Sequence, residues 1–124
     1  MQATFALSGL AGSFTVAEQG IADLLLVEGN TVVPIEASGV AKSADALVNG
    51  VEAEFKTITG TGANTLKNAI QEAAQQGDLI VVDARKVPSI GNSNAVDQIL
   101  RAQGNVGNLQ GRVIVFTKDG MVAY

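Results

Sequence analysis

Apolar residues recur at helical spacing in three segments of the chain, and each segment is bounded by residues that stop helices. The pattern predicts a first helix over 14–27, a second from Asn64 to Gly77 and a third after the loop 86–94. The apolar stripes that carry this prediction are Phe14, Ala17, Ile21, Leu24 and Leu25, then Leu66, Ala69, Ile70, Ala73 and Ala74, then Ala95, Val96, Ile99 and Leu100. Thr15 with Glu18 three residues later fits a capping box at the start of the first helix.

Shorter apolar runs predict the strands. The segment 31–35 follows the Gly29-Asn30 stop, and 112–117 is turned at Asp119-Gly120 into a short tail. The run 79–82 is apolar at every position, as expected of a strand that is buried on both faces. Asp83 and Arg85 follow that run, where α/β proteins often place ligand contacts, and a structural ion pair between them is the alternative.

The pair Asn49-Gly50 lies between two further apolar runs and predicts a β-hairpin over 44–57, because both residues tolerate positive φ. A two-residue turn there pairs Val48 with Val51 and continues outward to Asp45 opposite Glu54. Directly opposite side chains are roughly 4.5–5.5 Å apart, and like charges at that spacing are destabilising. A divalent cation between the two acids would resolve the conflict.

These elements predict one α/β (α+β) domain. Their order is α-β-β-β-α-β-α-β, a mixed β-sheet flanked by helices. Residues 1–13 are small and apolar without a clear period and are interpreted as a linker or disordered lead-in, which leaves 14–124 as the domain.

Composition narrows the possible chemistry. The 124 residues suffice for one sizeable core. They include no Cys, which excludes disulfides and thiolate nucleophiles, and no His, which excludes imidazole general bases. The net charge of −4 offers no global attraction to nucleic acid. We expect no membrane segment, since the run 24–27 is far too short to cross a bilayer, and no cofactor nucleotide, since the loop at Gly60 and Gly62 lacks the Lys-Ser/Thr of a Walker motif.

The polar face of the hairpin is the candidate site. Asp45, Glu54 and Lys56 share it, and Mg²⁺ (or Mn²⁺) usually takes one or two carboxylates plus waters and substrate phosphate. Asp45 and Glu54 would bind the metal, and Lys56 would activate the attacking water or steady the charge on phosphorus. The alternative is a solvated face on which Lys56 partly neutralises the acids.

The spacing of an Asp followed by Glu-x-Lys resembles the PD-(D/E)xK motif, and the element order resembles the core of the restriction-endonuclease-like superfamily. More closely, residues 15–118, and 43–85 above all, resemble the C-terminal nuclease domain of contact-dependent growth inhibition toxins. The segments that carry this likeness are Ser43–Val51, Leu66–Gln76, Leu79–Arg85 and the final strand. The chain has Ala44 where many relatives carry Pro.

The resemblance implies a metal-dependent endonuclease (tRNase) toxin of bacterial competition. It places the metal-binding acids at Asp45 and Glu54, the motif lysine at Lys56 and a further site acid at Glu18. It also implies tRNA as the favoured substrate over DNA, a cognate immunity protein as partner, and secretion as the C-terminal part of a larger exported protein that acts in the cytoplasm of the target cell.

Two more cations are weaker candidates for contacts with substrate phosphate. Lys67 lies on the second predicted helix, where a solvated face is the alternative, and Arg85 follows Asp83. Two other functions stay open: a metal-independent ribonuclease of the barnase- and colicin-like toxin group, and an acidic binding module without enzymatic activity.

Overall fold

The computed structural model describes residues 14–35 and 44–124, so the predicted lead-in 1–13 lies outside the described residues. The described residues form three helices, which are α2 (Val16–Val27), α3 (Thr65–Ala73) and α4 (Asn92–Val106). The strands are β1 (Val32–Pro34), β2 (Ala46–Val48), β3 (Val51–Thr57), β4 (Leu79–Asp83), β5 (Val113–Thr117) and β6 (Gly120–Ala123). The predicted fold class, a single mixed α+β domain, is confirmed.

All six strands belong to one sheet in the order β1-β2-β3-β4-β5-β6. Strands β3, β4 and β5 are parallel, and the outer pairs are antiparallel. The last strand was not predicted. After the turn at Asp119-Gly120, where Gly120 has φ 137°, the expected tail pairs with β5, and Tyr124 N donates to Val113 O at 2.9 Å. The segment after this turn is too short for its apolar spacing to predict a strand.

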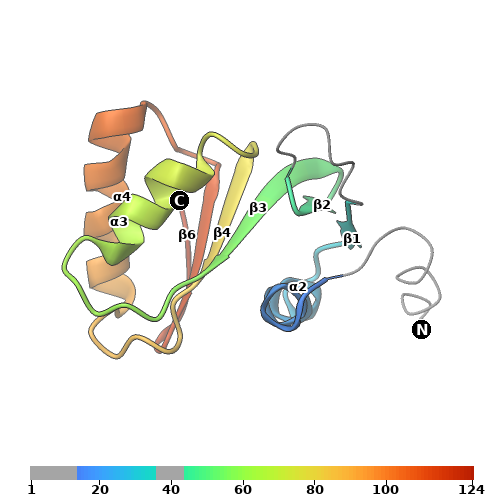
Figure 1. The fold of residues 1–124 in the computed structure, drawn as a ribbon, viewed down its shortest axis with the longest axis horizontal. Coiled ribbons are helices and arrows are strands. Elements are labelled where there is room, and N and C mark those ends of the chain that lie inside the picture. Colours follow the sequence, from blue (N-terminus) through green and yellow to red (C-terminus); the bar gives the residue numbers. More distant parts are fainter. Residues whose placement is uncertain (1–13, 36–43) are drawn as a thin grey trace.

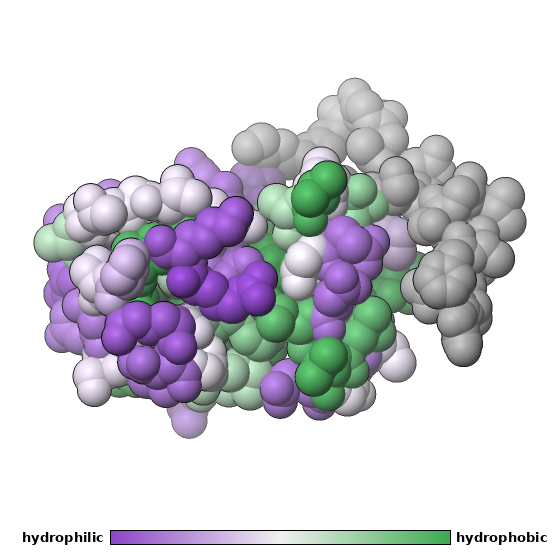
Figure 2. Space-filling model, turned by 90° about the horizontal axis from the view of Figure 1, so that it is seen from below, coloured by the Kyte–Doolittle hydropathy of each residue, from purple (hydrophilic) through white to green (hydrophobic). Residues whose placement is uncertain are grey.

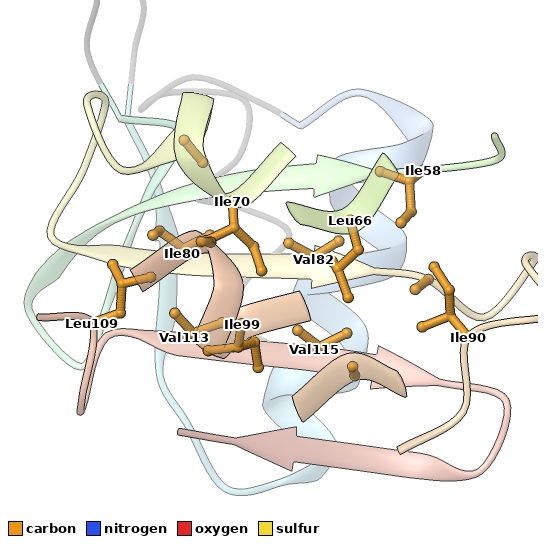
Figure 3. Packing of buried hydrophobic residues seen from close by; sticks show 14 of the residues in the cluster. Ile58, Leu66, Ile70, Ile80, Val82, Ile90, Ile99, Leu109, Val113 and Val115 are labelled. Atoms are coloured by element: carbon orange, nitrogen blue, oxygen red, sulfur yellow. The ribbon is translucent and has the colours of Figure 1, made fainter. Parts of the chain in front are cut away.

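The sheet is the middle of three layers, with α3 and α4 on one side and α2 on the other (Figure 1). The larger core lies under α3 and α4 and includes the residues labelled in Figure 3. The smaller core lies under α2, where Ile21 and Leu25 pack with Ala53, Phe55 and Val81. Because β4 contributes Val81 to one core and Val82 to the other, its uninterrupted apolar sequence follows from burial on both faces.

The buried stripe of α4 differs from the predicted one. Val96 and Leu100 are 39% and 48% exposed, and the buried residues are Ala95, Gln98, Ile99 and Ala102. Gln98 is buried because its amide is satisfied: its Oε1 accepts from Lys67 N at 2.9 Å and its Nε2 donates to Asn94 Oδ1 at 2.6 Å. Hydropathy alone therefore predicted Ala95 and Ile99 correctly, and it was wrong for Val96 and Leu100.

The surface divides in the same way as the layers. Figure 2 shows the strongest hydrophobic colouring in the half of that view where α2 lies, whereas hydrophilic and neutral residues prevail in the half of α3 and α4. On α2, Val16 and Val27 are 93% and 83% exposed. None of the helices in the described part of the chain combines the length and apolar character needed to cross a membrane.

Candidate active site

The hairpin between β2 and β3 turns at Asn49 and Gly50, which have φ of 52° and 83°. Such values suit a two-residue turn whose twist matches the strands. The Asn49 side chain also fixes the start of β1, since its Oδ1 accepts from Thr31 N at 2.9 Å and its Nδ2 donates to Asn30 Oδ1 at 2.8 Å. The predicted turn is confirmed, and it holds three strands in register.

The predicted pairing holds from the turn as far as Ala46 and Ala53, where the β2–β3 register ends. Asp45 is not paired opposite Glu54 as expected. Its backbone N donates to Ala53 O at 2.9 Å, and its Oδ2 accepts from Phe55 N at 2.8 Å. The side chain thus takes the position of a strand acceptor, and the ladder gives way to a bulge-like irregularity. The Asp45 carboxylate lies against the peptide that joins Glu54 to Phe55.

Glu54 and Lys56 project from β3 toward α3. Ala53 and Phe55 are buried in the core under α2, and side chains alternate along a strand, so Glu54 and Lys56 occupy the other face. Both are half-buried. The structure therefore brings together the Asp45 carboxylate, Glu54 and Lys56 around one short stretch of β3.

Glu72 joins this group from α3 and was not predicted. It forms an ion pair with Lys56 Nζ, whose side chain is 26% exposed, compared with 67% for Glu72. The order of the strands could have predicted this contact between α3 and β3. Strands β3 and β4 are parallel, so α3 must cross back over the sheet, and polar residues beside its apolar stripe then face β3.

Two contacts fix the end of α3 that carries Glu72. A Cβ added to Gly77 would lie 3.2 Å from both Glu52 O and Glu54 N, so this glycine permits close approach of the chain to β3. Arg112 of the loop before β5 donates to Asp78 O at 2.9 Å and to Gly77 O at 3.2 Å. Backbone carbonyls after a helix are thereby satisfied, and the helix end is tied to the sheet.

Glu18 has the capping role that the sequence allowed. Its side chain accepts from Thr15 N at 2.9 Å, and its backbone N donates to Thr15 Oγ1 at 3.1 Å. Helix α2 packs on the face of β3 opposite Glu54 and Lys56, so the structure does not bring Glu18 together with them. Within 14–35 and 44–124, no group of three or more His, Cys, Asp or Glu side chains is arranged to hold a metal ion.

Arg85 is bound to Asp83 by a two-pronged ion pair: its Nε donates to Oδ1 and its Nη2 to Oδ2, both at 2.9 Å. Burial alone would raise the pKa of Asp83, but the hydrogen bonds and charge of Arg85, with a smaller contribution from Lys86, outweigh it and lower the pKa. The same pairing raises the pKa of Arg85. Asp83 shares the sheet face of Val81, away from Lys56, so this pair stands apart from the hairpin.

Lys67 lies in the first turn of α3, and its backbone N is held by Gln98 Oε1. Four residues along, Gln71 Oε1 accepts from Asn105 Nδ2 at 2.8 Å and so joins α3 to α4. Lys67 is therefore on the helix that supplies Glu72, nearer its start, and its side chain is half-buried.

The donor set suits a hard cation. Carboxylate oxygens are the ligands that Mg²⁺ prefers, and one or two of them suffice when substrate phosphate and water complete the shell. Asp45 Oδ2 accepts from Phe55 N, and this bond fixes the orientation of the carboxylate. Asp45 and Glu54 carry oxygen ligands of this kind, and Lys56 lies two residues after Glu54 on β3.

Comparison with known protein families identifies a relationship. The family model described as the contact-dependent growth inhibition CdiA C-terminal domain matches residues 42–122, which include every residue of the candidate site except Glu18. Searches of curated proteins and of solved structures each found no significant match.

Proposed function

This chain belongs to the contact-dependent growth inhibition CdiA C-terminal domain family, and from that premise we propose that it hydrolyses phosphodiester bonds in nucleic acid, with tRNA as the favoured substrate. Family membership makes it a toxin domain of interbacterial competition, part of a larger secreted protein, with a cognate immunity protein as partner. The nuclease activity and its substrate are our proposal.

One observation carries the proposal. The Asp45 carboxylate is fixed by Phe55 N against the peptide that follows Glu54, one residue before the Lys56–Glu72 pair. Acids, a cation and a partner for that cation are thereby held on rigid elements around β3. Catalysis of phosphoryl transfer depends mainly on the precise placement of a few charged groups.

Asp45 and Glu54 would hold Mg²⁺ or Mn²⁺, which in bound form supplies an activated water and neutralises charge on the phosphate. The half-buried Lys56 is oriented by Glu72. It positions the attacking water or stabilises the negative charge that develops on the phosphate oxygens. These roles of Asp45, Glu54 and Lys56 accord with a PD-(D/E)xK nuclease. Glu18 is then a structural residue that stabilises the start of α2 through its capping box.

The choice of tRNA over DNA rests on the family likeness. A structured RNA is recognised by shape and phosphates more than by base edges, which suits a chain with five aromatic residues and little capacity for extended base stacking. After secretion, the domain would act in the cytoplasm of the target cell.

A metal-independent ribonuclease is the second candidate. It is favoured by the Lys56–Glu72 pair, an acid and a base in contact. It also needs no set of three metal-holding side chains, and none is arranged in that way within the described residues. Cleavage that persists in excess EDTA would distinguish it from the metal-dependent reaction.

Inducible expression in bacteria tests the proposed function. We expect growth arrest accompanied by fragmented tRNA and intact chromosomal DNA on gels, and relief of the arrest by Asp45→Asn. A Glu18→Gln variant serves as a control, because it changes an acid that lies away from Asp45 and Glu54. This variant should remain toxic. Arrest without any damage to nucleic acid would contradict the proposal.

A further inference from the structure

A pocket of about 330 Å³ opens where the parallel strands end, on the α3 and α4 side of the sheet. It lies between the loop after β3, the loop before α4 and the first turns of α4. Its lining residues are Thr61, Gly62, Ala63, Ser89, Ile90, Asn94, Gln98 and Arg101. Figure 3 shows Ile90, which forms part of its wall, at the same end of the core as Ile58 and Leu66.

The lining is rich in hydrogen-bond donors and contains no carboxylate. Arg101 is its one charged residue, and Thr61 and Ser89 add exposed hydroxyls. Asn94 Oδ1 accepts from Gln98 Nε2 at 2.6 Å, so the Asn94 amide nitrogen is oriented away from that bond. Donors around one guanidinium suit an anion of phosphate type.

Arg101 is held in place at the rim of the pocket. Its Nη1 donates to Asn64 Oδ1 at 2.6 Å, its Nη2 to Ala63 O at 3.3 Å and its Nε to Asp97 Oδ2 at 3.0 Å. Each terminal nitrogen of a guanidinium carries a second hydrogen. The side chain is 41% exposed, so those hydrogens are accessible, and the guanidinium is pre-positioned without being fully used.

We propose that this pocket binds a backbone phosphate of the nucleic-acid substrate, away from the bond that is cut. The inference rests on the proposed function for the identity of the ligand. What this inference adds is a second contact point for the substrate, which fixes the register of the RNA strand along α3. Phosphate contacts of this kind position a nucleic acid without reading its sequence.

The pocket lies at the start of α3, and the candidate active site includes Glu72 near the end of the same helix. The loop 59–63 begins three residues after Lys56, and α3 then leads from Thr65 back to Glu72. Seven residues of helix span about 10 Å, a length that a few nucleotides of one strand can cover. One RNA strand can therefore reach both places.

Equilibrium binding of unmodified tRNA in EDTA, measured across a range of salt concentrations, tests the pocket without any need for cleavage. We expect Arg101→Gln to weaken binding about five- to tenfold and to reduce the slope of log K against log salt by about 1, because one phosphate contact is lost. Thermal melting of the variant verifies that the contact between Arg101 and Asn64 is not required for folding.

A second test compares two variants that change the charge by the same amount, and one of them should strengthen tRNA binding. Asp97→Asn removes the carboxylate that competes for Arg101, whereas Asp23→Asn makes the same change of charge on α2, across the sheet. We expect Asp97→Asn to tighten tRNA binding at least threefold more than Asp23→Asn.

The outcomes separate this inference from the proposed function. An unchanged salt slope for Arg101→Gln, equal effects of the two Asp variants, or no binding of tRNA by the parent protein in EDTA would each overturn the pocket assignment. Binding that follows the expected pattern supports it whether or not the parent protein cleaves the RNA. A lack of cleavage alongside that pattern would count against the proposed function alone.

Discussion

Asp45 has one role that the structure shows and one that we propose. Its Oδ2 replaces a strand acceptor for Phe55 N, and the same bond fixes the carboxylate where an ion and a phosphate could approach. The sequence indicated the acid and its neighbourhood but predicted the wrong relation to Glu54. The physical reason is that direct pairing of two acids is unfavourable, and a side-chain hydrogen bond offered the chain a way to avoid it.

Substitutions of Asp45 separate these two roles. Asp45→Asn retains an oxygen for Phe55 N, so we expect the free energy of unfolding to change by less than about 1 kcal/mol, while tRNA cleavage falls at least about a hundredfold with the lost charge. Asp45→Ala loses both the charge and the oxygen that accepts from Phe55 N. We expect it also to be destabilised by about 1 to 3 kcal/mol, the cost of leaving the partly buried Phe55 N donor unsatisfied. Urea unfolding and single-turnover cleavage measure the two effects. Equal cleavage by Asp45→Asn and the parent would remove Asp45 from the site.

The Asp83–Arg85 pair predicts a pH dependence of stability. The pKa of Asp83 is lowered below its ordinary value of 3.8. The stabilisation is therefore present above the unfolded-state pKa and is lost as pH falls through the lower folded-state pKa. We expect the free energy of unfolding to decline as pH falls from about 4 downward, and to decline less steeply in Asp83→Asn. Parallel declines in the two proteins would show that Asp83 does not contribute in this range.

At the scale of elements, local patterns were sufficient for most of the fold. The Asn49-Gly50 turn, the buried β4 and the apolar stripe of α3 follow from short-range rules, and the structure confirms them. Contacts between distant elements were not predictable in this way. Glu72 meets Lys56 only because α3 crosses over β3, and Gln98 is buried only because Lys67 N is there to satisfy it.

Two glycine substitutions test how closely the segment after α3 must approach β3. Gly77→Ala places a Cβ 3.2 Å from the backbone of Glu52 and Glu54, and those strand atoms are held in the ladder. We expect a destabilisation of about 1 to 3 kcal/mol. Gly104→Ala in α4 meets nothing within 4 Å and should stabilise the protein by about 0.5 to 1 kcal/mol through helix propensity. Differential scanning calorimetry compares the two; a Gly77→Ala variant as stable as the parent would contradict the close approach.

At the scale of the whole molecule, the sheet divides two tasks between its faces. The core under α2 packs against the β2–β3 hairpin on one face, and α3 and α4 on the other face supply Glu72 and the pocket that we propose binds phosphate. The net charge of −4 makes the local arrangement of cations decisive for any attraction to RNA. Composition alone gave no indication of the proposed nucleic-acid function, which the sequence suggested only through the order of its elements and the spacing of Asp45, Glu54 and Lys56.

The most direct test of the central claim is the single-turnover rate at which the purified domain cleaves tRNA with Mg²⁺ present, compared between the parent protein and Lys56→Met. Met retains much of the apolar stem of Lys56 and removes its charge, so the fold should persist, which circular dichroism verifies. Our account predicts cleavage by the parent and a loss of at least about a hundredfold in the variant. Equal rates in the two proteins, or a parent without any cleavage of nucleic acid, would contradict it.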